Sequence, residues 1–177
     1  MNEFDPGLDE GQAITAEDLG RIFKCSSQGG MRRSHRTNSL VLIARTSGAT
    51  YFDRWEGDVF LYTGMGLVGD QSLDHAQNRT LAESDTNGVR IFLFENPGPN
   101  EYVFAGRVTL ARGPHSEVQR DADGNDRRVW VFPLSVIRDE ETARSDLEAI
   151  VRDLAPDQVD RVIQFARALR GFEADQG

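Results

Sequence analysis

Two tyrosines and an acidic residue lie close together in the segment from Tyr51 to Gly66, and their types suit the binding of a nucleobase. Tyr51 and Tyr62 offer flat faces on which a base can stack. The carboxylate of Asp53 can accept a hydrogen bond from an exocyclic amine on the Watson–Crick edge of that base. Such a pocket would hold a base extruded from a duplex. A β-hairpin with core aromatics and a surface acid has the same spacing, so the sequence segment alone leaves both readings open.

The formal net charge of −9 argues at first against a nucleic-acid partner, but the charges are unevenly distributed. Residues 1–18 contain six acids and no base, and residues 139–177 contain ten acids and five arginines. Residues 19–52 contain no acid and six bases, which are Arg21, Lys24, Arg32, Arg33, Arg36 and Arg45. Phosphate binding depends on a local basic patch rather than on total charge. This segment is therefore a candidate DNA-backbone contact, with an ordinary solvated stretch as the alternative.

Short apolar runs with turn residues between them predict a β-rich domain. The expected strands are residues 40–44, 59–63, 89–95, 102–110 and 128–134. Asp123-Gly124 is a hairpin signal before the last of them. Many short strands with few helices between them favour a barrel over a βαβ fold.

Helices are expected mainly at the two ends of the chain. Thr15 resembles an N-cap of a helix that reaches about Cys25, and residues 77–84 predict a second, short helix. Residues 1–14 are expected to be a flexible acidic leader, and the polar, basic stretch 26–38 is expected to be a loop. Residues 138–177 predict an appended pair of helices, 139–153 and 157–172, separated by Pro156. The apolar stripes of these two helices would pack against each other or against the barrel. Alternatively, they would bind a partner chain, which could be a second copy of this chain.

The composition also argues against several functions. No apolar run approaches the length of a membrane span, so we expect a soluble, cytoplasmic protein without a membrane partner. The three histidines do not have metal-ligand spacing, and no nucleophilic triad is recognisable. We therefore expect no catalytic residue, no metal and no cofactor, which is the pattern of a binding module rather than an enzyme.

Six short blocks, in this order along the chain, resemble the SRA (SET- and RING-associated) domain, a reader of 5-methylcytosine in DNA. The blocks are residues 29–42, Tyr-Thr-Gly-Met-Gly at 62–66, Gly-Asp-Gln-Ser-Leu at 69–73, Gln-Asn-Arg-Thr-Leu at 77–81, and the runs 89–95 and 102–108. They are most similar to the bacterial SRA-like modules often fused to HNH nucleases. The resemblance covers roughly residues 20–137.

This resemblance implies an α+β fold: a twisted SRA/PUA-like β-barrel with flanking helices, followed by the C-terminal helical pair. Residues 15–137 would form the modified-DNA-binding domain. Tyr51 and Tyr62 would sandwich the flipped cytosine, and Asp53 would accept from its amine. Thr63, Gly64 and Met65 would form the pocket rim near the 5-methyl group, where a thioether can pack well against a methyl.

The eukaryotic SRA domains also have a long finger after the glycine turn that enters the duplex, and here that finger is essentially missing. The loop Gln28–Asn38 is the alternative wedge, with Met31 as its apolar tip and Arg32, Arg33 and Arg36 on phosphates. The family blocks add three further backbone candidates, Ser39, Asn78 and Arg79, of which the last two could equally cap a helix.

The resemblance therefore implies a non-catalytic bacterial reader of 5-methylcytosine in double-stranded DNA, located at the nucleoid, that flips the modified base and depends little on sequence context. One alternative is the recognition domain of a modification-dependent, type IV-like HNH restriction endonuclease whose nuclease domain is absent here. Another is a PUA-like barrel that binds modified RNA.

Overall fold

The computed structural model describes residues 4–45, 51–138 and 140–174. The chain divides into two compact units, Met1–Ile137 and Arg138–Gly177, which are treated separately below. The first unit is a β domain with two helices, and the second consists of two helices.

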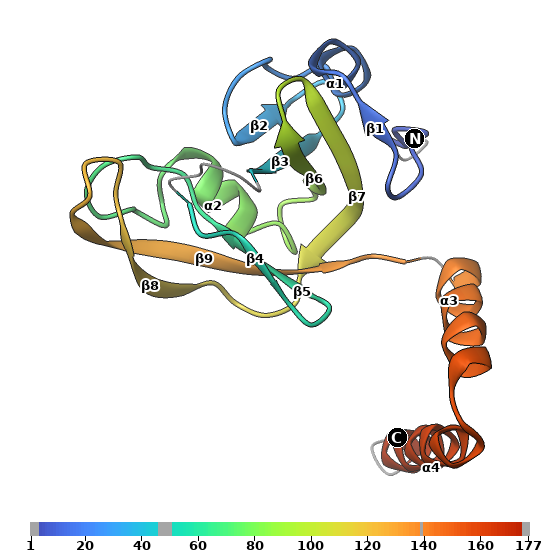
Figure 1. Cartoon of the computed structure of the whole chain (residues 1–177). Helices are drawn as coiled ribbons and strands as arrows, with labels where there is room; N and C mark the ends of the chain where they lie inside the picture. The colour runs from blue at the N-terminus through green and yellow to red at the C-terminus, as the bar shows by residue number, and fades with distance from the viewer. Residues whose placement is uncertain (1–3, 46–50, 139, 175–177) are drawn as a thin grey trace. The chain divides into compact units, whose positions relative to one another are not determined.

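The β domain contains nine strands in the described part of the chain, and they form one mixed sheet (Figure 1). Its elements are β1 (Ala13–Ile14), α1 (Ala16–Phe23), β2 (Met31–Ser34), β3 (Ser39–Arg45), β4 (Arg54–Glu56), β5 (Val59–Thr63), α2 (Ala76–Ala82), β6 (Arg90–Gly98), β7 (Glu101–Leu110), β8 (His115–Arg120) and β9 (Asp126–Val136). The strand order is β2-β3-β6-β7-β9-β5-β4, with β1 paired to β7 and β8 paired to β9. Only β3 and β6 run parallel to each other among these pairs.

The long strand β7 curves from β6 to β9 (Figure 1). Val108 faces Ile91 on one side and Val136 on the other, so the sheet continues through this strand. The pairing of β6 with β7 shifts register between Leu93 and Phe94, beside Gly106. A bulge of this kind bends a strand and increases its twist, and it helps the sheet to curl into a barrel.

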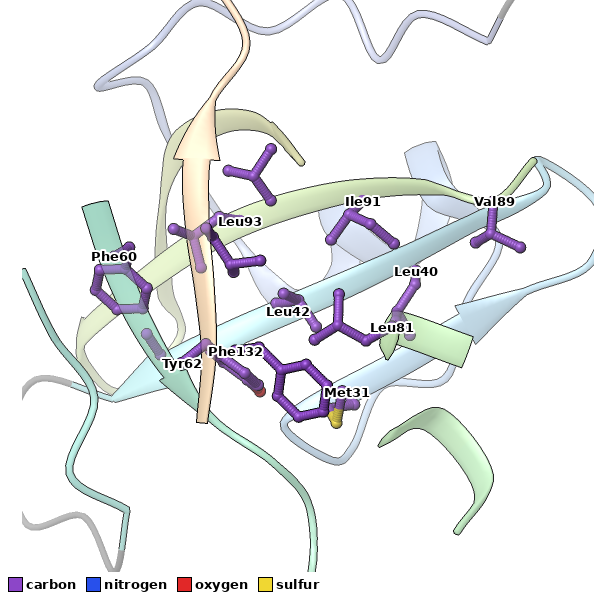
Figure 2. Packing of buried hydrophobic residues seen from close by; sticks show 13 residues of the cluster. Met31, Leu40, Leu42, Phe60, Tyr62, Leu81, Val89, Ile91, Leu93 and Phe132 are labelled. Atoms are coloured by element: carbon purple, nitrogen blue, oxygen red, sulfur yellow. The ribbon is translucent and has the colours of Figure 1, made fainter. Parts of the chain in front are cut away.

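Side chains on the central strands β3 and β6 alternate between two buried clusters, because successive residues of a strand point to opposite faces. Leu40, Leu42 and Ala44 of β3 and Ile91 and Leu93 of β6 lie in the larger cluster. Phe60, Tyr62, Leu81 and Phe132 belong to the same cluster (Figure 2). On the same two strands, Val41 and Phe92 pack instead against Leu19 and Phe23 of α1. Both faces of these two strands are therefore covered.

At the N-terminal end of the domain, the structure agrees with the helix expected from the sequence but differs from the expected flexible leader. Helix α1 begins after Thr15, whose side chain accepts from the backbone N–H of Asp18 as an N-cap should. The expected loose leader is wrong for residues 4–14. Phe4 packs edge-to-face on Phe23, and β1 pairs with β7, because the leader carries apolar residues that complete the cluster under α1.

The expected loop at residues 26–38 is also wrong in part, because it contains the strand β2. Met31 pairs with Leu42, and Ser34 pairs with Ser39, in an antiparallel hairpin with β3. The two consecutive arginines, Arg32 and Arg33, make the sequence of this strand look like that of a polar loop. In the structure, the guanidinium of Arg32 lies over the ring of Tyr102, 5.3 Å from its centroid. This cation–π contact with a residue distant in sequence stabilises the charge of Arg32.

The second unit contains α3 (Glu140–Asp153) and α4 (Pro156–Ala174). Proline at the first position of α4 suits a helix start, because the missing N–H would have no partner there. The side chain of Gln158 accepts from the backbone N–H of Ala155, in the turn before α4. Within the described residues, no helix is both long and apolar enough to cross a membrane. A protein partner or self-association through these helices stays a prediction.

Candidate modified-base pocket

A cavity of about 430 Å³ opens between the β4–β5 hairpin, the hairpin β2–β3 and the loop after β5. Its lining includes all six residues predicted for the base pocket, namely Tyr51, Asp53, Tyr62, Thr63, Gly64 and Met65. Arg32, Arg45 and Tyr102 line other parts of the same cavity. The pocket therefore has an acidic group in one wall and cationic groups in another.

Asp53 lies just before β4, with its carboxylate against the end of β5. One oxygen, Oδ1, accepts from the backbone N–H of Thr63 at 2.7 Å. Burial raises the pKa of Asp53 to about 6, although hydrogen bonds from Thr63 favour the charged form. Within the described chain, no basic side chain forms an ion pair with it. A desolvated carboxylate without a cationic partner is suited to accept hydrogen bonds from a ligand.

The two tyrosines are held in different ways. Tyr62 is only 3% exposed and belongs to the hydrophobic core (Figure 2). Its hydroxyl donates to the carbonyl of Gly30 at 2.9 Å, and burial raises its pKa well above the usual value. Tyr51 is half-buried and donates to the carbonyl of Gly66 at 3.2 Å. Tyr62 is thus a fixed wall of the cavity, and Tyr51 is a more accessible wall held by polar contacts.

Arg127 in β9 is a site residue that the sequence did not indicate. It is buried, its guanidinium lies 5.8 Å from the centroid of Tyr51, and it donates to the carbonyl of Gly66. The contact joins residues 61 positions apart, so only the β8–β9 fold brings them together. Arg127 therefore positions both Tyr51 and the glycine turn.

Buried amides determine the conformation of the turn after β5. Asn78 of α2 accepts from the N–H of Met65 at 2.8 Å and donates to the carbonyls of Met65 and Ser72. Gln71 donates to the carbonyl of Gly64 at 2.6 Å. The predicted contact of Asn78 with DNA is therefore wrong, because its side chain is fully buried and holds the turn.

Gly64→Ala should damage this pocket, because an added Cβ would lie 2.7 Å from Oδ1 of Asn78. We expect a loss of stability of about 1–3 kcal/mol, as for other overpacked positions, together with weaker ligand binding. Gly113→Ala is the matched control, since an added Cβ meets nothing within 4 Å there. Thermal unfolding of the two variants tests this, and equal stability would show that Asn78 can move freely.

Several predicted backbone or wedge residues are unsuited to that role in the structure. Met31 is buried in the larger core cluster, and Ser39 is completely buried. Arg32 is almost fully buried, with its Nε donating to the carbonyl of Gly29 at 2.8 Å. These three residues are therefore not exposed on a loop, because they lie in β2 and β3. Met31 and Arg32 line the cavity instead, and their contact with DNA stays a prediction.

The remaining three candidates differ in how available they are. Arg33 donates to the carbonyls of Ser34 and Ser39 and to the side chain of Asn38, so its charge is largely engaged. Arg79 is exposed but pairs with Glu83 at 2.9 Å. Arg36 is exposed. The exposed tip before β2 is residues 26–30, which precede Met31.

The nine-stranded sheet and the cavity beside β5 define the class of this protein: it has the PUA-like barrel fold of SRA domains. A family model described as "ScoMcrA-like, SRA domain" matches residues 10–156. The chain therefore belongs to the ScoMcrA-like SRA domain family. A search of curated proteins finds no match.

Solved structures show the same fold at low sequence identity. The sulfur-binding and SRA domains of ScoMcrA, complexed with phosphorothioated DNA, match with a TM-score of 0.62 and 19% identity over 76% of this chain and 42% of that one. The SUVH5 SRA domain with methylated CHH DNA matches at 0.57 and 22% identity over 76% and 92%. The modification-dependent TagI restriction endonuclease matches at 0.55 and 22% over 76% and 51%. This chain thus spans less than half of the ScoMcrA fragment.

Proposed function

We propose that this domain binds duplex DNA in which a cytosine carries a 5-methyl group, and that it holds the flipped base between Tyr51 and Tyr62. The observation that carries the proposal is the desolvated carboxylate of Asp53, which has no ion-pair partner among the described residues, inside a cavity with these two rings. The SRA structures of SUVH5 and ScoMcrA with modified DNA support the choice of ligand class. The proposed place of action is the bacterial nucleoid.

Asp53 would select cytosine through the chemistry of its amine. The Thr63 N–H fixes Oδ1, and a carboxylate with two oxygens offers about four lone-pair sites, so acceptor capacity remains. Cytosine presents an amine donor there, whereas thymine presents a carbonyl oxygen. The site would therefore reject thymine, because two acceptors would face each other in a buried space.

The cavity has room for this ligand. About 430 Å³ corresponds to the volume of about fourteen water molecules at about 30 Å³ each, more than one pyrimidine ring requires. Space remains for a 5-substituent and part of the deoxyribose. Met65 at the rim can pack against a methyl group.

A binding assay with paired duplexes that differ only in one methyl group tests the proposal. We expect tighter binding to the methylated duplex, and an increase in the fluorescence of a 2-aminopurine placed next to it when the base leaves the stack. Matched RNA and phosphorothioate duplexes are included as competitors. Equal affinity for methylated and unmodified DNA would overturn the proposal, and preference for either competitor would redirect it.

A second function is favoured by the likeness to two restriction endonucleases, ScoMcrA and TagI. In that case the domain is the recognition module, and a nuclease domain supplies the cleavage. Among the described residues, no group of three or more His, Cys, Asp or Glu could hold a metal ion. Incubating the chain with methylated DNA and Mg²⁺, Mn²⁺ or Zn²⁺ tests for cleavage by the chain itself. Cleavage would overturn the assignment as a binding module.

Sequence context should have little influence on binding. The segment from Gly66 to Asp70 contains Leu67 and Val68, whose side chains cannot form hydrogen bonds with base edges. We therefore expect methylated cytosine followed by G, A, T or C to bind with affinities within about 1–3 kcal/mol, through differences in unstacking. A competition series that changes only this flanking base is the measurement. Strong CpG selectivity would indicate that residues 26–30 read the neighbouring pair.

A further inference from the structure

The half-buried face of strand β8 is polar, although the inward face of such a strand is usually apolar. His115, Glu117 and Gln119 are half-buried and alternate with exposed residues, of which Val118 is 72% exposed. This arrangement is informative because polar groups that leave water need hydrogen-bond partners. Glu117 and Gln119 find theirs in the wall of the pocket around Asp53.

Glu117 holds two side chains that in turn bind the backbone of Phe52. Its Oε1 accepts from Nη2 of Arg54 at 2.9 Å, and its Oε2 accepts from Nε2 of Gln119 at 3.4 Å. The N–H of Phe52 donates to Oε1 of Gln119 at 3.3 Å, and its carbonyl accepts from Nη1 of Arg54 at 3.4 Å. Both sides of this residue are therefore bonded, which positions the two pocket residues that flank it in the chain.

The amide of Gln119 also reaches the hydroxyl of Thr63, which is 2% exposed. Nε2 of Gln119 lies 3.3 Å from Oγ1 of Thr63. The amide has one possible orientation here, because the ionised carboxylate of Glu117 can only accept and the N–H of Phe52 can only donate. Oγ1 of Thr63 therefore accepts from Gln119, and its own hydrogen is left to donate to Asp53.

We propose that Gln119 is a positioning residue of the base pocket, which holds the backbone beside Asp53 and directs the Thr63 hydroxyl at the Asp53 carboxylate. This inference rests on the proposed function. Hydrogen bonds donated to a carboxylate favour its charged form, and the charged form is the one that accepts from a cytosine amine. Gln119 thus acts on the base through Thr63 and Asp53, from a strand 56 positions further along the chain.

Other charged or titratable groups lie around Asp53, so a pH effect has to be assigned with a control. In the cavity and in a neighbouring one of about 320 Å³ that Asp53 also lines, these groups are Arg32 of β2, Arg45 of β3, Tyr51, Arg54 of β4, Tyr62 of β5, Glu95 of β6 and Tyr102 of β7. His115 lies 3.2 Å from Oε1 of Glu117, and histidine ordinarily titrates at about pH 6.5. His115→Gln is the matched control, because in the described part of the chain this side chain bonds Glu117 rather than Thr63.

Gln119→Leu tests the role, because leucine is of similar size but can neither donate nor accept. An NMR titration of the Asp53 carboxyl carbon in the free protein should show its pKa rise by about one pH unit, the effect of one hydrogen bond to a charged group. The affinity for methylated duplex at neutral pH should fall about threefold, since the wall loses a hydrogen bond. His115→Gln should leave both quantities at their wild-type values.

Thr63→Val distinguishes action through the hydroxyl from a general loosening of the wall. This change should raise the pKa of Asp53 by itself, and adding Gln119→Leu should raise it no further, because residues that act through one contact have non-additive effects. An unchanged pKa in Gln119→Leu, or the same rise with and without the Thr63 hydroxyl, would overturn the proposal.

Thermal unfolding verifies that the variants fold, and Gln119→Met is a second replacement that also cannot donate to Thr63. The titration of Asp53 is measured without DNA, so it tests Gln119 whatever the ligand is. Failure of the wild-type protein to prefer methylated DNA would instead overturn the proposed function, and the two failures are therefore distinguishable.

Discussion

Tyr51→Ala should weaken binding to methylated duplex DNA at least about tenfold and leave binding to unmodified DNA nearly unchanged. Stacking of a base on an aromatic side chain contributes about 1–3 kcal/mol, and Tyr51 is the accessible wall of the pocket. The guanidinium of Arg127 also lies over the ring of Tyr51, so the variant removes a ring that this contact holds in place. Equilibrium titration with the paired duplexes measures the effect.

Two further variants separate stacking from other causes. Tyr51→Phe keeps the ring and loses only the hydrogen bond to Gly66, so it should retain most of the affinity. Phe52→Ala removes the neighbouring ring, which is 61% exposed and contacts Arg54, and should have little effect. Wild-type affinity in a folded Tyr51→Ala protein would show that the base does not stack there.

The corresponding change at Tyr62 is a poorer test of binding. Because Tyr62 is buried in the core, Tyr62→Ala should cost about 3–5 kcal/mol of stability, as other aromatic-to-alanine changes in cores do. Any loss of binding would then be mixed with unfolding. Tyr62→Phe removes only the hydroxyl that donates to Gly30 and leaves the stacking face.

Part of the candidate pocket could be predicted from sequence, because the residues of that part are close together in the chain. Six of its lining residues lie between positions 51 and 65: Tyr51 and Asp53 come just before β4, and the other four lie at the end of β5 and in the turn after it. The main strands were predicted for a related reason, since β3 and β6 are apolar on both faces and stand out from the polar turns around them. The hairpin at Asp123-Gly124 follows from turn chemistry alone.

The errors occurred where polar residues are satisfied by partners distant in sequence. Arg32 interacts with Tyr102, 70 positions away, and Asn78 holds the turn at Met65. From sequence both looked like exposed DNA contacts, because a sequence shows a donor or a charge but not what it is bonded to. Arg127 was missed for the same reason, since its contact with the pocket exists only after β9 has folded beside the glycine turn.

Asp53→Asn should make the protein more stable and, at the same time, a poorer reader. The ordinary pKa of this carboxyl is 3.8, and burial raises it to about 6 in the folded protein. Well below pH 3.8 the group is protonated in both the folded and the unfolded states and contributes no pH dependence. As the pH rises from there through about 6, ionising it costs more in the folded state, so the free energy of unfolding falls.

The pKa difference corresponds to about 3 kcal/mol at pH 7.5, which is an upper bound on what the neutral amide can recover. The amide oxygen can still accept from the N–H of Thr63, so the turn should be preserved. Chemical denaturation of both proteins between pH 4 and 8 is the measurement. We expect the stability of the variant to exceed that of the wild type increasingly as the pH rises through about 6. Parallel curves would show that Asp53 is solvated in the folded state.

Ionisation of Asp53 should strengthen binding to methylated DNA, although it lowers the stability of the folded protein. The ionised carboxylate accepts from the cytosine amine, whereas a protonated oxygen presents a donor to it. The first measure is the ratio of the affinities for methylated and unmodified DNA, in which the phosphate contacts cancel. The second measure is the ratio of the affinities for duplexes with methylated cytosine and with thymine at the target position, which reports discrimination for cytosine. In the wild type both ratios should fall as the pH drops through about 6. In Asp53→Asn they should be low at every pH, which also controls for other titrating groups. Ratios that rise below pH 6 would instead mean that protonated Asp53 donates to the ring nitrogen N3, and the amine would no longer be its partner. Because Thr63 already donates to Oδ1, Oδ2 is the oxygen that would meet the base in the proposed complex, and the direction of the pH dependence reports whether Oδ2 carries a proton there.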